Sequence, residues 1–355
     1  MKFAFTMPHT MELKALTQPW EFSVTGADQT VMAKRAEELG YDMLAVPEHF
    51  VVPHTHVGLS GPHYFHSTVA QAYLAGATRS IPVNSAVTLL PVQHPVIMAK
   101  ALATADWMSS GRIMCTFGIG WDEEEFRILG VPFHERGCMA DEYLAAIIEL
   151  WTSEAPSFDG RYVSFGNVAF APKPVQKPHP PIWIGANADP AIRRAARLGD
   201  CWYVNPHNRI DTIVRQVDVY KRALDEYGKP FPAEFPARRE VFVARSRSEA
   251  IRLCAPFLSA KYKAYDEWGQ GRAMPAGDND LGVEFDELIR DRFLIGSPDE
   301  VAEQMLALER ATGINHLIMS VQWPGMPQRM ALDQLHMLAE EVFPKVRAAT
   351  RNTRA

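Results

Sequence analysis

The chain has 355 residues, 47% of them hydrophobic, and a formal net charge of −6. Because an acidic chain is repelled by a phosphate backbone, the composition disfavours nucleic acid as a partner. No run reaches the roughly 18 uninterrupted apolar residues of a membrane helix, and the first residues lack the pattern of a signal peptide. We therefore expect a cytoplasmic protein without a membrane partner.

Short apolar runs typical of strands alternate along the chain with longer runs of helical periodicity. The predicted strands span residues 2–7, 43–46, 82–89, 112–117, 181–184, 201–204, 239–244 and 316–320. The predicted helices span residues 28–39, 95–108, 136–151, 189–198, 210–227, 248–263, 298–311 and 328–343. The helix that begins at residue 298 has a start signal, because Ser297 and Glu300 have the spacing of a capping box.

This regular alternation predicts a parallel sheet with right-handed crossovers. Eight strand–helix units favour a closed barrel, so we expect an α/β fold, a single (β/α)8 TIM-barrel domain over residues 1–355. Three segments interrupt the pattern and are expected as insertions after strands two, four and seven, at about residues 50–66, 153–180 and 266–290. The start of the last, residues 266–280, is polar and Gly-rich, which predicts a long loop.

In such a barrel the active site lies at the carboxyl ends of the strands. Two of these ends lead into glycine-containing turns, Gly118-Ile119-Gly120-Trp121 and Gly185-Ala186-Asn187. Backbone N–H groups freed at such turns can bind a phosphate, and two neighbouring turns could hold one cofactor. Each could equally be a tight turn without a ligand. We interpret the acidic run 122–125 as the start of a helix rather than as a metal site.

His49 comes just after the second predicted strand and follows Glu48 in the sequence. An imidazole at a strand end can donate or accept a proton near neutral pH, which makes His49 a candidate acid or base. The alternative is a structural histidine that is hydrogen-bonded in the barrel rim. Position alone leaves both open.

The insertion 50–66 contains the further histidines His54, His56, His63 and His66. A His-x-His pair can bind a metal, which would suit a metal-dependent barrel hydrolase. The later Lys, His and Asp set that such a site requires is not recognisable, so we expect no metal. The length of the insertion favours a lid over a bound substrate.

A set of motifs runs in fixed order through nearly the whole chain. They are PVNSAVTLLPVQHP (82–95), GIGWDEEEF (118–126), LGVPFHERG (129–137), KPVQKPHPPIWIG (173–185), RRAARLGD (193–200) and IGSPDEV (295–301). In order and spacing they resemble the bacterial-luciferase-like monooxygenase superfamily. Within it, the pattern is most similar to the branch that uses the deazaflavin coenzyme F420.

The resemblance implies a flavin or deazaflavin whose ring rests on a bulge of the third strand, often with a cis peptide. The motif places this bulge at Ser85-Ala86, with Val87 and Thr88 beside the ring. The family's phosphate contacts match the two glycine turns, which consist of Gly118, Ile119, Gly120, Trp121, Gly185, Ala186 and Asn187. Related deazaflavin enzymes have an acidic residue and a histidine that match Glu48 and His49, which implies that Glu48 holds a catalytic His49.

We therefore expect hydride transfer between coenzyme F420 and a small apolar or ring-containing organic substrate, with His49 moving the accompanying proton. The alternative is a monooxygenase that uses reduced FMN and oxygen on a similar substrate. A flavin-binding relative without activity is also open, because a fold does not fix a function. Barrels of this type often pair through outer helices, so we also expect a homodimer.

Overall fold

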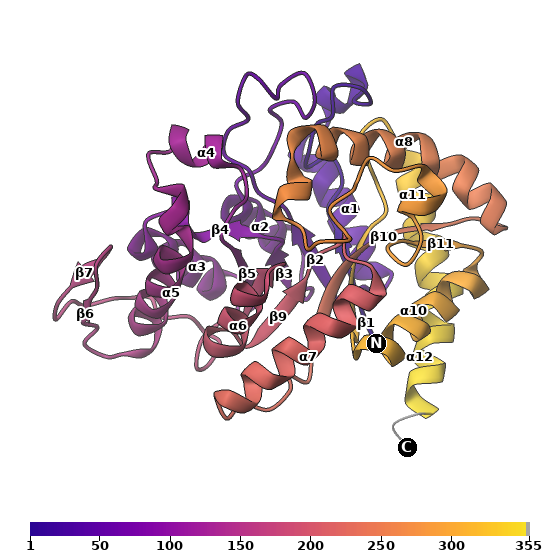
Figure 1. The fold of residues 1–355 in the computed structure, drawn as a ribbon. Helices are drawn as coiled ribbons and strands as arrows, with labels where there is room; N and C mark the ends of the chain where they lie inside the picture. Colours follow the sequence, from indigo (N-terminus) through magenta and orange to yellow (C-terminus); the bar gives the residue numbers. More distant parts are fainter. Residues whose placement is uncertain (353–355) are drawn as a thin grey trace.

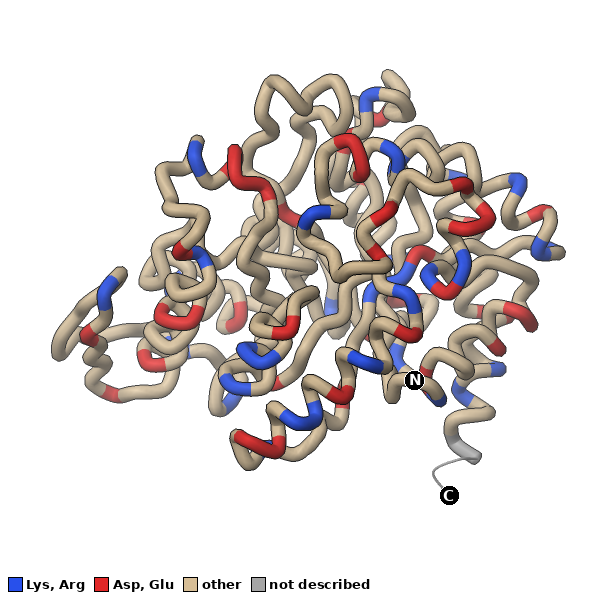
Figure 2. Tube along the Cα trace, viewed as in Figure 1, with Lys and Arg blue, Asp and Glu red and all other residues tan. Residues whose placement is uncertain are grey.

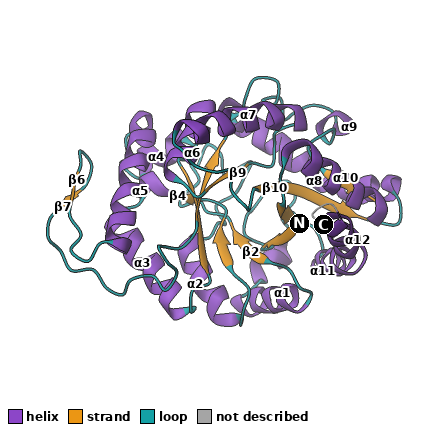
Figure 3. Ribbon diagram, turned by 90° about the horizontal axis from the view of Figure 1, so that it is seen from below, coloured by secondary structure: helices purple, strands orange, loops and turns teal. Residues whose placement is uncertain are grey.

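The computed structural model describes the backbone of residues 1–352 and the side chains of residues 1–350. Parallel strands close into an eight-stranded barrel in the order β1, β2, β3, β5, β8, β9, β10 and β12, and β12 pairs with β1 to complete the circle. Helices form a ring around these strands (Figure 3). The predicted (β/α)8 barrel is confirmed.

The barrel strands are almost entirely buried, as expected where helices cover a parallel sheet. Their bounds are β1 (Lys2–Thr6), β2 (Met43–Val46), β3 (Val83–Ser85), β5 (Ile113–Gly118), β8 (Ile182–Ala186), β9 (Cys201–Val204), β10 (Pro236–Val243) and β12 (His316–Ser320). Outside the circle, β4 (Thr88–Leu89) pairs with β5, and β11 (Leu294–Gly296) pairs with β10. A separate antiparallel hairpin joins β6 (Phe158–Asp159) and β7 (Ser164–Phe165).

The helices follow the strands as the alternation predicted. Their bounds are α1 (Gly26–Glu38), α2 (Ser67–Ala77), α3 (Pro95–Met108), α4 (Glu123–Ile128), α5 (Arg136–Thr152), α6 (Asp189–Leu198), α7 (Ile210–Glu226), α8 (Arg247–Trp268), α9 (Phe285–Leu288), α10 (Pro298–Thr312), α11 (Gln328–Met337) and α12 (Phe343–Asn352). The capping box of α10 is confirmed, because the Ser297 N–H donates to Glu300 and the Glu300 N–H donates to Ser297 Oγ.

The structure adds or moves several elements. Helix α2 was missed because its buried face carries polar residues; Gln71, for example, donates to the carbonyls of Val83 and Met114. The predicted loop 266–280 begins inside α8, which continues to Trp268 and ends at Gly269 with a φ of 89°. The short strand β11 was not predicted either. Each of these elements is stabilised by contacts with distant segments, which a local pattern does not contain.

The three insertions lie around the barrel in different places. Residues 50–66 follow β2 and lie with the end of α8 over the same end of the barrel (Figure 1). The segment 153–180 contains the β6–β7 hairpin, which projects from the side of the molecule. The segment 266–290 begins in α8 and includes α9. Two of the three insertions can therefore cover the carboxyl ends of the strands.

Candidate active site

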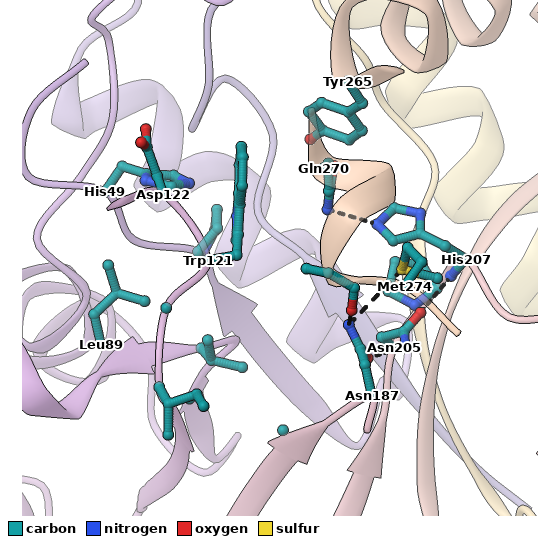
Figure 4. A pocket seen from close by; sticks show the side chains of 18 of the residues that line it. His49, Leu89, Trp121, Asp122, Asn187, Asn205, His207, Tyr265, Gln270 and Met274 are labelled. Carbon is teal, nitrogen blue, oxygen red and sulfur yellow. Dashed lines mark hydrogen bonds between the residues drawn. The ribbon is translucent and has the colours of Figure 1, made fainter. Parts of the chain in front are cut away.

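A cavity of about 1000 Å³ opens at the carboxyl ends of the barrel strands. His49 and Trp121 lie on one side of it, and His207 and Gln270 lie on the other (Figure 4). The exits of strands two to five therefore meet in one pocket, as the barrel geometry predicted. Its volume is at the upper end of the range for small-molecule and cofactor sites.

The floor of this cavity is built by Val87 on two glycines. The peptide bond between Ala86 and Val87 is cis and separates β3 from β4, one residue beyond the predicted bulge at Ser85-Ala86. A Cβ on Gly118 would lie 2.6 Å from Val87 Cγ2, and one on Gly185 would lie 3.1 Å from Val87 Cγ1. Because Val87 occupies the space over both glycines, neither position has room for a side chain, and we call this surface of Val87 on Gly118 and Gly185 the shelf.

Most of the residues predicted to bind the cofactor line the cavity. They are Ala86, Val87, Gly118, Ile119, Gly120, Trp121, Gly185, Ala186 and Asn187. Ser85 and Thr88 do not line it. The Ser85 hydroxyl bonds to the backbone of Thr116 at 3.2 Å, and the Thr88 hydroxyl lies 2.9 Å from Ser67 Oγ. Both side chains are held inside the wall, and the roles expected for Ser85 at the bulge and Thr88 beside the ring stay predictions.

His49 is paired with Glu125, not with Glu48. Its Nδ1 lies 3.1 Å from Glu125 Oε2, across 76 residues of sequence. Burial raises the pKa of Glu125, but hydrogen bonds from His49 and from the N–H groups of Phe50 and Val51 outweigh it and lower the pKa. An ionised carboxylate only accepts, so Nδ1 carries the hydrogen of this bond, and Nε2 has no hydrogen-bond partner among the described residues. The acidic run 122–125 is a helix start, as predicted, and also supplies this partner.

Glu48 bonds to other groups, so the predicted Glu48–His49 pair is wrong. Its Oε1 accepts from the backbone and the hydroxyl of Ser67 at 2.9 and 2.8 Å, and its Oε2 accepts from the Leu89 N–H at 2.8 Å. Burial raises the pKa of this carboxyl above its usual value, although those hydrogen bonds act in the opposite direction. Glu48 thus joins β2, α2 and β4, which makes it a positioning residue of the cavity wall.

An aromatic cluster surrounds His49. Its ring centroid lies 4.8 Å from that of Tyr64, 6.2 Å from Trp121 and 5.6 Å from Trp268. The Trp268 indole N–H donates to Asp122 at 3.2 Å, which ties the end of α8 to the start of α4. The cluster joins insertion 50–66, the first glycine turn and α8, so both covering segments limit the access of water to His49.

Charged groups at the two glycine turns were not predicted as site residues. Arg136 donates from Nε to the Gly120 carbonyl at 3.2 Å, and its guanidinium lies over the Phe133 ring at 3.6 Å. Arg215 and Arg272 also line the cavity. The acidic start of α4 lies on the same rim (Figure 2). The rim therefore carries three arginine cations and, at the start of α4, a separate cluster of carboxylates with a local excess of negative charge.

The histidines of insertion 50–66 do not converge. His56 faces the Trp268 ring at 5.7 Å, His63 faces Phe65 at 5.4 Å, and His66 lies 3.3 Å from Glu48. Across the described residues, no group of three or more His, Cys, Asp or Glu side chains could hold a metal ion. In the same part of the chain, no helix has the length and apolar character needed to cross a membrane. The homodimer stays a prediction.

A histidine–carboxylate pair and an open main-chain shelf at the mouth of a barrel are typical of an enzyme that binds an organic cofactor. The luciferase-like monooxygenase family model matches residues 1–316, so the chain belongs to this family. It is 32% identical over 267 residues to an FMNH2-dependent dimethylsulfone monooxygenase of Pseudomonas putida, a match that covers 71% of this chain and 72% of that protein.

Solved structures share the fold. A monooxygenase of Streptomyces bottropensis has a TM-score of 0.81 at 22% identity, covering 97% of this chain and 99% of that chain. An F420-dependent secondary alcohol dehydrogenase has a TM-score of 0.74 at 16% identity, covering 97% and 98%. The protein is therefore an enzyme of the luciferase-like oxidoreductase family with a flavin-type cofactor.

Proposed function

We propose that this protein is a monooxygenase that uses reduced FMN and molecular oxygen on a small organic substrate. The observation that carries the proposal is the shelf that Val87, Gly118 and Gly185 form beside His49 in one cavity. A planar ring could rest against Val87 there, because the Val87 side chain packs directly on both glycines. When bound, reduced FMN would supply the electrons that activate oxygen.

The glycine turns would hold the phosphate of the cofactor. The N–H groups at residues 118–121 and 185–187 lie at strand ends, and Arg136 is fixed beside the first turn by its bond to Gly120. The acidic start of α4 on the same rim repels a long anionic tail. This favours FMN, with one phosphate, over coenzyme F420, whose tail carries further acidic groups.

His49 would move a proton at the reacting end of the substrate. With Nδ1 donating to Glu125, its Nε2 is free, and the side chain is 16% exposed. Glu125 would stabilise the imidazolium that forms when Nε2 takes up a proton. Trp121, Trp268 and Tyr64 around the imidazole would exclude water during this step.

We thus propose FMN ahead of coenzyme F420, which reverses the preference expected from the motifs. The relative at 32% identity is named for FMNH2, whereas the F420-dependent dehydrogenase resembles this chain at 16% identity. Hydride transfer with coenzyme F420 is the second candidate, supported by the motif resemblance and by that shared fold.

Titration of the protein with FMN, reduced FMN and coenzyme F420, followed by quenching of tryptophan fluorescence, tests the proposal. We expect reduced FMN to bind at least about tenfold more tightly than F420, a difference of about 1.4 kcal/mol. Oxygen uptake with reduced FMN should exceed that of the free flavin. Tighter binding of F420, without oxygen uptake, would replace the proposal by the second candidate.

A further inference from the structure

The wall of the cavity opposite the shelf is built from four neighbouring strands, β9, β10, β12 and β1. Tyr203, Arg238, Ser320 and Thr6 from these strands all line the cavity. In the order of the barrel, three strands separate β10 from β3 in either direction. Arg238 therefore lies across the barrel from Val87, whereas Tyr203 pairs with Gly185 at the edge of the shelf. The motifs did not predict any of them as site residues.

Arg238 is a cation with little local compensation. Its Nε donates to Ser320 Oγ at 2.9 Å, and within the described part of the chain this is its one guanidinium hydrogen bond, with no carboxylate in ion-pair distance. The neighbouring Arg239 differs, because it donates to the carbonyls of Asn205, Pro206 and Asn208. A guanidinium has five N–H donors, so Arg238 retains donors for a ligand.

Two buried hydroxyls on residues that line the same cavity as Arg238 lack a hydrogen-bond partner among the described residues. They are Tyr203 Oη and Thr6 Oγ1, on residues that are 3% and 6% exposed. Tyr203 and Arg238 line the same cavity from the paired strands β9 and β10; burial raises the pKa of Tyr203 to about 12, and the charge of Arg238 opposes this rise. At neutral pH Tyr203 is therefore a proton donor. Buried polar groups are normally satisfied, so these hydroxyls point to a missing acceptor.

Lys261 and Glu240 form an ion pair that lines the same cavity. Lys261 Nζ lies 2.6 Å from Glu240 Oε1, and the Trp323 indole N–H donates to Glu240 Oε2 at 2.6 Å. Glu240 is paired directly with Lys261, and the charges of Lys261 and Arg238 both lower its pKa, so one carboxylate serves two cations. Burial, followed by the charges of Lys261 and Arg238, lowers the pKa of His207 well below its usual value, so His207 stays neutral. The wall keeps an excess of positive charge.

We propose that Arg238, Tyr203 and Thr6 form a subsite for an anionic group of the substrate, a carboxylate or a sulfonate. The inference rests on the proposed function, because a cofactor ring on the Val87 shelf leaves the opposite wall to the substrate. A guanidinium and two hydroxyls supply convergent donors for the oxygens of such a group. The rest of the substrate would extend toward Tyr265 and Trp268, which line the same cavity. The substrate class is therefore an organic acid with an apolar part.

Binding of benzenesulfonate and of methyl phenyl sulfone, its uncharged analogue of similar size, tests the subsite by calorimetry with and without FMN. We expect the sulfonate to bind the wild-type protein about 10- to 100-fold more tightly than the sulfone. Arg238→Gln should abolish this preference, and Arg238→Lys should keep part of it. Arg193→Gln is the control, since Arg193 is a surface residue paired with Glu226. Equal affinities of both probes for the wild type would overturn the proposal.

Tyr203→Phe separates binding from folding. Because the hydroxyl has no partner, its removal should leave the melting temperature unchanged or higher, while the sulfonate affinity falls several-fold. An unchanged sulfonate affinity would count against the subsite. If Arg238→Gln weakens the binding of FMN but not that of riboflavin, the wall that contains Arg238 binds the cofactor phosphate and the proposal fails. If FMN binds to no variant while the preference for the sulfonate persists, the proposed function fails and the anion subsite stands.

Discussion

Two walls of the same cavity use different chemistry. On the main-chain wall, formed by β3, β5 and β8, the ligand meets Val87, which packs on Gly118 and Gly185 where no other side chain has room. On the wall of β9, β10, β12 and β1, it meets side chains, with Arg238 and Tyr203 as the polar groups that remain available. One wall is shaped by the absence of side chains and the other by their charge.

The difference separates general from specific recognition. Backbone N–H groups and a flat shelf suit any cofactor with a planar ring and a phosphate. The side-chain wall selects among substrates, because an unpaired buried donor rejects a ligand that lacks an acceptor. His49 and Glu125 lie between the two walls and belong to the reaction rather than to either ligand. Substitutions in each wall should therefore have separable effects.

The largest expected effect is on the side-chain wall. Lys261→Met leaves Glu240 buried without its counter-charge, so the free energy of unfolding should fall by about 3–5 kcal/mol, measured by urea denaturation. Lys263→Met is the matched control, because the Lys263 side chain is 75% exposed, and it should change stability by less than about 0.5 kcal/mol. Similar losses in both variants would show that the buried pair does not stabilise this wall.

The next effect concerns turnover. His49→Ala removes the proton acceptor without touching the shelf, so turnover should fall by about 100-fold or more. Fluorescence titration should show nearly unchanged FMN affinity. His54→Ala, on the exposed part of the same insertion, should keep full activity. Unchanged turnover in the His49 variant would dispose of its catalytic role.

A smaller effect is expected on the main-chain wall. Gly118→Ala places a Cβ 2.6 Å from Val87, so it should cost about 1–3 kcal/mol of stability and weaken FMN binding. Gly185→Ala, with a closest approach of 3.1 Å, should cost less. Gly76→Ala in α2 has open space around it and should stabilise the protein by up to about 1 kcal/mol. A larger loss of stability in Gly185→Ala than in Gly118→Ala would contradict the shelf geometry.

The smallest effect is the pH dependence of stability that the His49–Glu125 pair between the two walls contributes. The pKa of Glu125 is lower in the folded protein than the 4.5 of a free glutamate. Its contribution to stability is therefore present above about pH 4.5 and is lost as the pH falls through the folded-state pKa. Between pH 5 and pH 3, the melting temperature of Glu125→Gln should fall less than that of the wild type. Glu341→Gln, at an exposed position of the last helical segment, should follow the wild type.

Local sequence patterns predicted much of the main-chain wall. The glycine turns at Gly118 and Gly185 were predicted from local spacing, and the resemblance to the luciferase-like family implied the bulge in the third strand and the place of Val87. The orientation of the side chains could not. Ser85 and Thr88 flank the cis peptide, and their side chains turn into the wall because the bulge changes the alternation of the strand.

The partner of His49 shows the same limit. Adjacency in sequence suggested Glu48, but the two side chains leave β2 in different directions, and Glu48 bonds to Ser67 and Leu89 instead. Glu125 lies 76 residues from His49, and its place in the acidic run was explained by the helix start alone. No periodicity or spacing connects the two residues before β2 and β5 are placed in one barrel.

The sequence by itself determined the alternation of strands and helices, and hence the barrel and the end at which its pocket lies, because hydrophobic periodicity and glycine turns act over a few residues. Only the tertiary structure decided which side chains share the pocket. Tyr203 and Arg238 come from consecutive strands and Thr6 comes from the first strand, which barrel closure through β12 brings to the same wall. Their lack of partners depends on what surrounds them in space, which is why the proposed anion subsite has no signature in the sequence.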